Sequence, residues 1–308
     1  MFRIIGATHI DFIGVRKIAF VVSLALVVLG IVGLVMIATG NANLGIDFAG
    51  GVMVNGYFTQ PVTIDNLRSA VSLEFPDAQI TQLKDFKEEN AFIIKTKRPA
   101  TESEGEERLS ALYAVLQQEF PENTFTMISE HVIGPAVGQS LRSDAQKAVL
   151  LSLLGIIIYI WIRFDFRSGI AATIATFHDV LAVLGIVYVL GLEFDLLIVT
   201  ALLTLAGYSL TDTVVVYDRI RENLKKFRAK GEFAGAVNAS INEVLSRTIN
   251  TSLTVLIVVG TLFFFGGEVL RNFSLSLILG VIIGTYSSVF VASPIVVEWE
   301  ARRPKRFK

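Results

Sequence analysis

The sequence has 308 residues, of which 53% are hydrophobic and only 18% are charged. A soluble domain carries about 25% charged residues, so most of this chain is expected in apolar surroundings. The formal net charge of −1 provides no basic field and argues against a nucleic acid as partner. Because the sequence contains no cysteine, disulfides and thiolate metal sites are excluded.

The first apolar run, residues 18–38, follows Arg16 and Lys17 and has the outline of a signal peptide. It is about 20 residues long, whereas a cleavable apolar region usually has about 7–15. No convincing small-x-small cleavage pattern follows it. We therefore predict a retained membrane span.

Six apolar segments are long enough, or nearly so, to cross a bilayer core about 30 Å thick. Because the backbone must satisfy its own hydrogen bonds in lipid, each segment is predicted to be a helix. The expected fold is a polytopic α-helical membrane protein with six transmembrane helices. Their ranges are 18–38, 146–162, 170–190, 196–217, 248–265 and 273–297.

The lysines and arginines of the short loops predict the orientation, because cytoplasmic loops carry an excess of both. They gather at one set of helix ends, whereas the opposite short loops, 191–195 and 266–272, offer only Arg271. Both termini are therefore expected in the cytoplasm. The cytoplasmic segments are then 1–17, the loop 218–247 and the basic tail 298–308, and the periplasmic segment is 41–142.

The periplasmic segment is predicted to form one small α+β domain. Its second helix is amphipathic, with Leu109, Leu112, Leu116 and Phe120 on one face. The element order β-α-β-β-α-β is that of a ferredoxin-like fold. Strands are expected at 51–58, 79–85, 91–97 and 124–133, and helices at 63–75 and 106–120.

The cytoplasmic loop contains apolar residues at helical spacing, at Phe233, Val237, Ile241 and 244–245. The spacing fits a helix that lies along the membrane surface. It fits equally a helix that continues directly into the fifth span.

Asp212 is the clearest ionisable residue inside a predicted span, near the cytoplasmic end of the fourth. Such a residue costs at least about 2.5–3.5 kcal/mol to insert, so it needs a partner, a cavity or a role. A buried carboxyl can take up and release protons near neutral pH. Arg247 opens the fifth span and could lie at the same depth. An ion pair broken by protonation would be a two-state element, whereas a static pair would only fix the helix register.

His178 and Asp179 interrupt the third span near its middle. A histidine beside a carboxylate could extend a proton path, since imidazole titrates near neutral pH. Alternatively, the two residues cap a polar cavity or form hydrogen bonds between helices without any role in transport.

Two further patterns have simpler explanations. Gly280 and Gly284, continued by Ser288, favour close helix packing. The charges from Asp218 to Glu222 fit a solvated helix end. Nothing in the sequence resembles a nucleotide-binding loop, a metal cluster or a nucleophile triad, so no enzymatic chemistry is predicted.

Several stretches carry a family resemblance. The sequence GIDFAGG at 45–51 looks like the GIDFxGG signature of SecF and SecD, and IGPAVG at 133–138 is similar to their VGPxVG stretch. The run GYSLTDTVVVYDRIREN at 207–223 closely matches the most distinctive SecF motif. The chain thus resembles the SecF family of protein-export membrane proteins, within the RND superfamily. The motif positions carried over are Gly45, Asp47, Phe48, Gly50, Gly51, Gly207, Tyr208 and Ser209.

The resemblance implies an auxiliary subunit of protein export in the bacterial cytoplasmic membrane. With SecD, such a subunit would use the proton gradient to promote the late stages of moving unfolded preproteins through the SecYEG channel, on which SecA acts. No cofactor is implied, and the coupling ion would be H⁺ or Na⁺, since a lone carboxylate suits either. By position, the relay would consist of Asp212, Arg247 and Asp179, supported by His178, Asp218, Arg219 and Glu222.

Two other classes of function stay open. A small-molecule or lipid exporter of the same superfamily usually joins two six-span halves in one chain, whereas this chain contains one half. A passive membrane scaffold would couple nothing, and Asp212 argues against it. The half-size favours a partner that supplies the other half.

Overall fold

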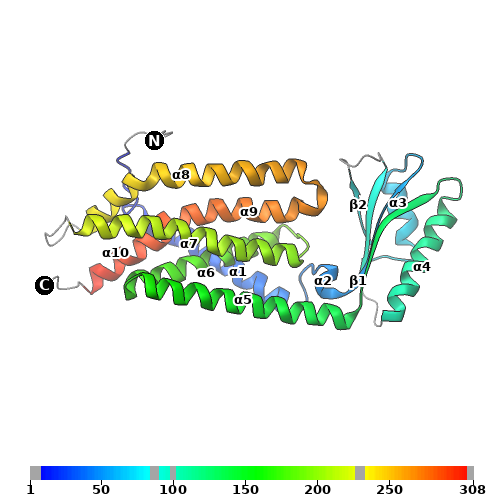
Figure 1. Cartoon of the computed structure of the whole chain (residues 1–308), viewed down its shortest axis with the longest axis horizontal. Helices are drawn as coiled ribbons and strands as arrows, with labels where there is room; N and C mark the ends of the chain where they lie inside the picture. Colours follow the sequence, from blue (N-terminus) through cyan, green and yellow to red (C-terminus); the bar gives the residue numbers. More distant parts are fainter. Residues whose placement is uncertain (1–7, 84–89, 98–101, 226–232, 304–308) are drawn as a thin grey trace.

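The structure is a computed structural model that describes residues 8–83, 90–97, 102–225 and 233–303. The molecule is elongated, with a bundle of long helices at one end and a small domain of strands and helices at the other (Figure 1). Parts of the predicted N-terminus, second strand, cytoplasmic loop and C-terminal tail lie outside the described residues.

Within the described residues, six helical segments are long and apolar enough to cross a membrane, which confirms the predicted number. The sixth is one continuous helical segment made of α9, a π-helical turn, η1 (Ser288–Ala292), and α10. The segments are α1 (Arg16–Ala38), α5 (Pro135–Arg163), α6 (Phe166–Val189), α7 (Leu196–Leu224), α8 (Phe233–Phe265), and α9 (Gly267–Ser287) with α10 (Ser293–Arg302).

The helices extend beyond the predicted spans. α5 begins at Pro135 instead of residue 146, because proline suits a first helical turn and the next turns are helical but polar. α8 is continuous from Phe233, so the surface helix is wrong and the continued helix is the one observed. The apolar stripe of its first turns, with Val237 and Ile241, packs into the core around Ile220 of α7 and therefore does not face lipid.

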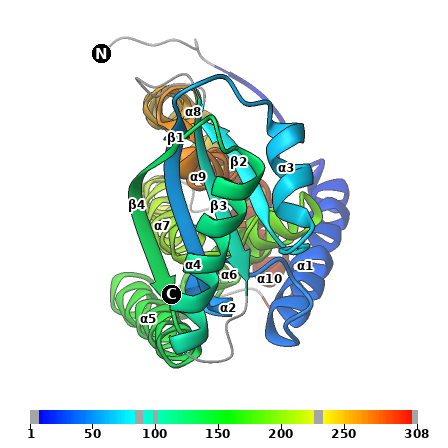
Figure 2. The same ribbon diagram turned by 90° about the vertical axis from the view of Figure 1, so that its right-hand side faces the viewer.

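The small domain has the predicted order of strands and helices. Its four-stranded sheet is antiparallel throughout, in the order β2-β3-β1-β4. Figures 1 and 2 show both helices on the face of the sheet that looks away from the bundle. The elements are β1 (Gly51–Phe58), α3 (Ile64–Ser72), β2 (Gln79–Leu83), β3 (Ala91–Lys97), α4 (Glu102–Glu119) and β4 (Phe125–Ile133).

The domain has its own apolar core between the sheet and these two helices. Alternate residues of the strands point into it, because side chains in a strand alternate between faces. Phe58 lies at its centre, with ring contacts to Phe92, Phe120 and Phe125. Leu112 of α4 is almost fully buried against the same group, as its amphipathic spacing predicts.

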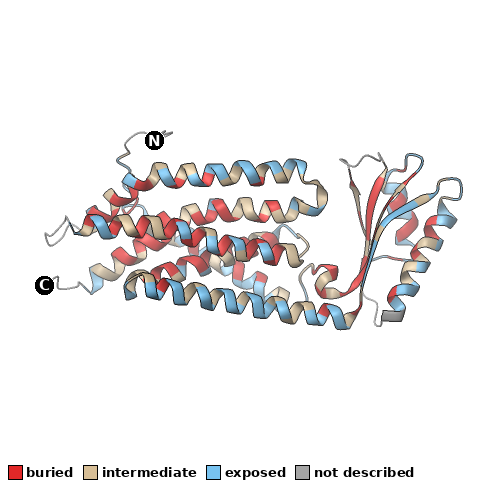
Figure 3. Cartoon of the chain, in the orientation of Figure 1, coloured by how far each residue is buried: buried red, intermediate tan, exposed pale blue. Residues whose placement is uncertain are grey.

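Three helices form the interior of the bundle. More than half of the apolar part of α6, α7 and the α9–α10 segment is buried, whereas for α1, α5 and α8 the buried share is at most 17%. Figure 3 shows this contrast, with buried residues concentrated along the central helices. A chain alone in lipid would leave the outer three helices largely uncovered.

Glycines allow α1 to lie directly against α6. A Cβ added to Gly185 of α6 would lie 2.6 Å from the backbone nitrogen of Gly30, and one added to Gly30 would lie 2.2 Å from the carbonyl oxygen of Leu181. Both contacts are with backbone atoms, which cannot move aside as a flexible side chain can. Small residues are the usual means of such close approach between membrane helices.

We predict that Gly185→Leu destabilises the protein by about 1–3 kcal/mol, because the added side chain overpacks the contact between α1 and α6. Thermal unfolding of the purified protein in detergent measures the change. Gly155→Leu on α5 is the matched control, since a Cβ there meets no atom within 4 Å. Equal unfolding temperatures for the two variants would contradict this account of the packing.

Candidate functional site

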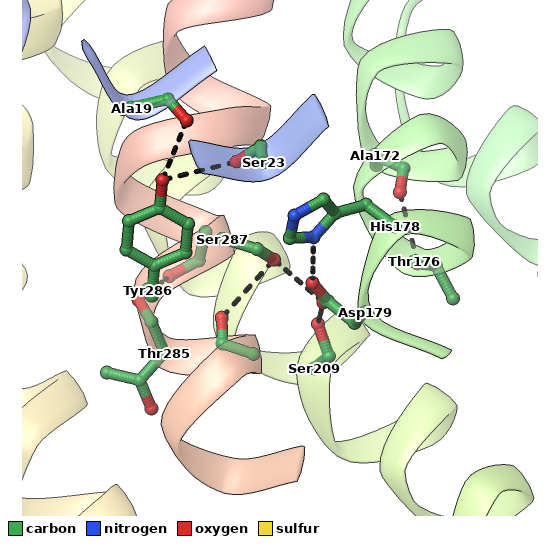
Figure 4. Close-up of polar contacts among 12 residues, drawn as sticks. Ala19, Ser23, Ala172, Thr176, His178, Asp179, Ser209, Thr285, Tyr286 and Ser287 are labelled. Carbon is green, nitrogen blue, oxygen red and sulfur yellow. Dashed lines mark hydrogen bonds and ion pairs between the residues drawn. The ribbon is translucent and has the colours of Figure 1, made fainter. Parts of the chain in front are cut away.

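A buried carboxylate lies where α6, α7 and α9 meet. Asp179 of α6 is fully buried and accepts hydrogen bonds from Ser209 of α7 and from Ser287 of α9, the latter at 2.7 Å (Figure 4). Its other oxygen lies 2.8 Å from Nδ1 of His178. Two further helices thus supply hydroxyl donors to one acidic side chain.

His178 extends this cluster toward α1. The imidazole is 3% exposed, and among the described residues its Nε2 atom has no hydrogen-bond partner. The ring centroids of His178 and Tyr286 lie 6.4 Å apart. The Tyr286 hydroxyl donates to the carbonyl of Ala19, and its oxygen lies 3.1 Å from the hydroxyl oxygen of Ser23 (Figure 4). Polar groups therefore run from Asp179 to α1, which carries Ala19 and Ser23.

Asp212 lies on α7, is 7% exposed, and accepts a 2.7 Å hydrogen bond from Ser288 of η1. The hydroxyl of Thr248 on α8 is close to the carboxyl but forms no hydrogen bond in the described structure. Within the described residues, Asp212 has no ion pair. A carboxyl surrounded by hydroxyls, without a fixed counter-charge, can exist in both protonation states.

The ion pair considered between Asp212 and Arg247 is not formed. Arg247 is exposed and has no ion pair within the described part of the chain, whereas the next residue, Thr248, is 2% exposed and faces the interior. Neighbouring residues on a helix point about 100° apart, so only one of these two can face α7. The rotation of α8 selects the threonine.

The charged residues after Asp212 connect helices at the end of the bundle far from the sheet. Asp218 pairs with Arg163 of α5 at 2.6 Å. Arg219 pairs with Glu222 on the same helix and with Glu243 of α8. These side chains are about one-third exposed or more, so each pair contributes little to stability. The structure thus separates the 218–222 cluster from the buried carboxyls.

The GIDFAGG stretch forms the junction between the bundle and the domain. Its short helix α2 (Ile46–Ala49) holds Asp47, whose carboxylate accepts from the backbone N–H of Leu196 at the start of α7. Phe48 packs against the ring of Phe194. Gly50 and Gly51 have φ values of 74° and 158°, and a Cβ on Gly51 would lie 2.4 Å from a carbonyl of β3. Only glycine readily adopts this backbone.

Two acidic residues that the sequence analysis missed strengthen this junction. Glu193 forms a largely buried ion pair with Lys95 of β3 at 2.6 Å. Asp195 caps α7 by accepting from the N–H of Ile198 at 2.8 Å. An aspartate directly before an apolar run is a known helix-start signal and could have been recognised. Desolvation by burial, together with the charges of Glu193 and Asp47, raises the pKa of Asp195 above its ordinary value.

We predict that the wild type loses stability as the pH rises above about 4, and that the Asp195→Asn variant does not. Because the carboxyl has a raised pKa in the folded state, the folded state binds the proton more tightly, and stability falls as pH rises toward neutrality. Asparagine caps a helix as well as aspartate does. Thermal unfolding is measured for both proteins at pH 4 and pH 7. Their unfolding temperatures should be similar at pH 4, and that of the variant should be higher at pH 7. Parallel pH dependence in both would contradict it.

The comparison with known proteins agrees with this architecture. A family described as protein export membrane protein SecD/SecF, C-terminal, matches residues 114–302. The chain belongs to the SecD/SecF family. It is therefore a membrane protein of a translocase family, in agreement with the predicted resemblance.

SecF relatives match over nearly their whole length. The protein translocase subunit SecF of Thermodesulfovibrio yellowstonii is 48% identical over 300 residues, which cover 96% of this chain and 97% of that protein. The SecF subunit of Desulfurispirillum indicum is 41% identical over 298 residues, which cover 96% of this chain and 93% of that protein.

A solved structure has the same fold. The crystal structure of SecDF, a translocon-associated membrane protein from Thermus thermophilus, superimposes with a TM-score of 0.79 at 38% identity and covers 96% of this chain. The chain spans only 39% of that SecDF chain.

The structure thus brings together some of the predicted site residues and separates others. Asp179, His178 and Ser209 form one cluster, and Asp212 lies beside it, while Arg247 and the 218–222 charges lie elsewhere. Sequence reasoning missed the role of the hydroxyls from α9 and η1. Their signal was the small polar residues that continue the Gly280 and Gly284 pattern. The roles of all these residues in transport stay predictions.

Proposed function

We propose that this SecD/SecF family member is an auxiliary subunit of the Sec protein-export machinery. In the bacterial cytoplasmic membrane it works with SecD and uses the proton gradient to promote the late stages of preprotein translocation through SecYEG, on which SecA acts. The observation that carries the proposal is Asp212, a membrane-buried carboxyl held by a hydroxyl and without a counter-charge among the described residues. Such a group suits reversible binding of H⁺, and also of Na⁺.

The uncovered outer helices support a partner in the membrane. Only 6% of the apolar part of α5 and 17% of that of α8 are buried within the chain. Arg247 is exposed on α8 at the start of the predicted fifth span and has no ion pair among the described residues, so its charge is available to a partner. A second six-helix half supplied by SecD would complete an RND-like unit and cover these surfaces.

The same proposal includes the orientation and the class of the domain. The strand order β2-β3-β1-β4, with both helices on one face, supports a ferredoxin-like domain. The distribution of lysine and arginine supports cytoplasmic termini and a periplasmic position for this domain. There it would contact the unfolded chain as it emerges from the channel.

α7 offers a route from the carboxyl to the domain. Protonation of Asp212 would remove the charge that its hydrogen bond from Ser288 stabilises, and α7 and α9 could then repack. The other end of α7 is held by Asp47 and Asp195 at the domain junction. A displacement of α7 would therefore reach the periplasmic domain through covalent and hydrogen-bonded contacts.

We expect Asp212→Asn to insert and to bind SecD normally but to lose the gradient-driven step, because asparagine is similar in shape and cannot carry the proton. Inverted vesicles with matched amounts of the subunit and SecD would be scored for completion of a stalled preprotein, with and without an imposed proton gradient, after ATP is removed. The gradient should speed completion in the wild type alone. An equal response in both would make Asp212 a structural residue and the proposal wrong.

Arg247→Lys should retain more of the gradient response than Arg247→Met, because lysine keeps the charge although it lacks the guanidinium geometry. The same vesicles measure this response, and co-purification of SecD reports whether the variants still assemble. Arg271→Met is the control, since Arg271 is an exposed arginine whose ion pair in the described structure is with the nearby Glu268. Equal responses of all three variants would show that the charge at position 247 has no part in coupling.

A further inference from the structure

Two adjacent serines connect the two buried carboxyls. Ser287, the last residue of α9, donates to Asp179 at 2.7 Å, and Ser288, the first of η1, donates to Asp212 at 2.7 Å. Both serines are fully buried. Because neighbouring helical residues point about 100° apart, one backbone segment reaches carboxyls on two different helices, α6 and α7.

Each serine has a second acceptor on its own helix. The Ser287 hydroxyl lies 3.5 Å from the carbonyl oxygen of Gly284, and the Ser288 hydroxyl lies 3.0 Å from that of Thr285. A hydroxyl has one proton and can donate a full hydrogen bond to one acceptor at a time. Each serine can therefore turn from its carboxyl to the backbone without being left unpaired.

The backbone at this place is suited to a small rearrangement. The pair lies where α9 changes into the π-helical turn, and such turns occur frequently at functional sites. Ser293 donates its hydroxyl to the carbonyl of Ser288 at 2.8 Å and so holds the wide turn. One turn earlier, Gly284 lets α9 approach α7 so closely that an added Cβ would lie 3.0 Å from that of Ser209.

We propose that Ser287 and Ser288 are positioning residues that make Asp179 and Asp212 respond to each other. A change of protonation at one carboxyl releases its serine, the π-helical turn shifts, and the hydrogen bond at the other carboxyl changes. The inference deepens the proposed function and rests on it for its role in export. The link itself is a property of this chain alone.

Few other groups act on Asp212. Asp179 of α6 and Tyr208 of α7 are the titratable side chains near it in the described structure, and Arg247 of α8 points outward. α8 and η1 present hydroxyls, from Thr248 and Ser288. A substitution that alters the titration of Asp212 from the side of Asp179 must therefore act through the serine pair or through space between the two charges.

The decisive variant is Ser287→Ala in the Asp179→Asn background, because the Ser287 hydroxyl touches the side chain at position 179 and not Asp212, and no charge at position 179 then acts on Asp212 through space. The carboxyl band of Asp212 would be followed by infrared difference spectroscopy during a pH titration of the purified chain in lipid, and assigned by its loss in Asp212→Asn. We expect the midpoint of this band to move by about one pH unit in Ser288→Ala, since the hydrogen bond to the charged carboxyl of Asp212 is lost. In Ser287→Ala we expect a measurable shift as well, because the lost contact displaces the π-helical turn that carries Ser288.

The matched control is Ser274→Ala. Ser274 is also fully buried on α9, but among the described residues its hydroxyl has no hydrogen-bond partner. In the Asp179→Asn background, an unchanged midpoint in Ser287→Ala, or an equal shift in Ser274→Ala, would overturn the link. If Ser288→Ala does not fold, Ser287→Ala and the control still decide.

The two proposals fail in different ways. A serine link without export function would show the infrared shift, while Asp212→Asn keeps its response to the gradient in vesicles. An export function without the link would show loss of that response in Asp212→Asn and an unmoved midpoint in Ser287→Ala. If no carboxyl band is lost in Asp212→Asn, Asp212 does not titrate and both are wrong.

Discussion

The burial of two carboxyl groups inside the helix bundle is the constraint on which its packing depends. A buried charge left without partners costs several kcal/mol, on the order of 3–5, so each carboxyl must be surrounded by donors. Asp179 and Asp212 obtain them from α7, α9 and η1, and this fixes how these elements are rotated against α6. Gly280 and Gly284 then become necessary, since the hydroxyls reach the carboxyls only if α9 lies close to α7.

The second feature of the architecture is that one helix takes part in both regions of interest. α7 carries Asp212 in the bundle, and its first residue, Leu196, is bound by Asp47 of the GIDFAGG stretch. The ion pair between Lys95 and Glu193 ties the sheet to the turn before α7. A local change of charge and a movement of the domain are thus mechanically connected in the proposed mechanism, without a separate transmitting element.

Sequence reasoning reached the elements but not their rotations. The six helices and the order of strands and helices along the chain were predictable, because apolar runs and alternating side chains depend on local sequence only. The absence of an ion pair between Arg247 and Asp212 in the described structure was not predictable, because a rotation of about 100° decides whether Arg247 or Thr248 faces α7. The serine pair was missed for the same reason, since its contacts exist only after three helices have been placed. The continuous start of α8 depended on packing against α7, which spacing alone does not reveal.

The central claim is that Asp212 carries the coupling proton, and proton flux tests it most directly. The chain and SecD would be reconstituted in liposomes that contain a pH-sensitive dye, and a potential would be imposed across the membrane. The account predicts proton flux with the wild type and with Asp218→Asn, whose partly exposed ion pair lies outside the buried site, and none with Asp212→Asn. Equal flux through Asp212→Asn would contradict the account and place the proton path elsewhere.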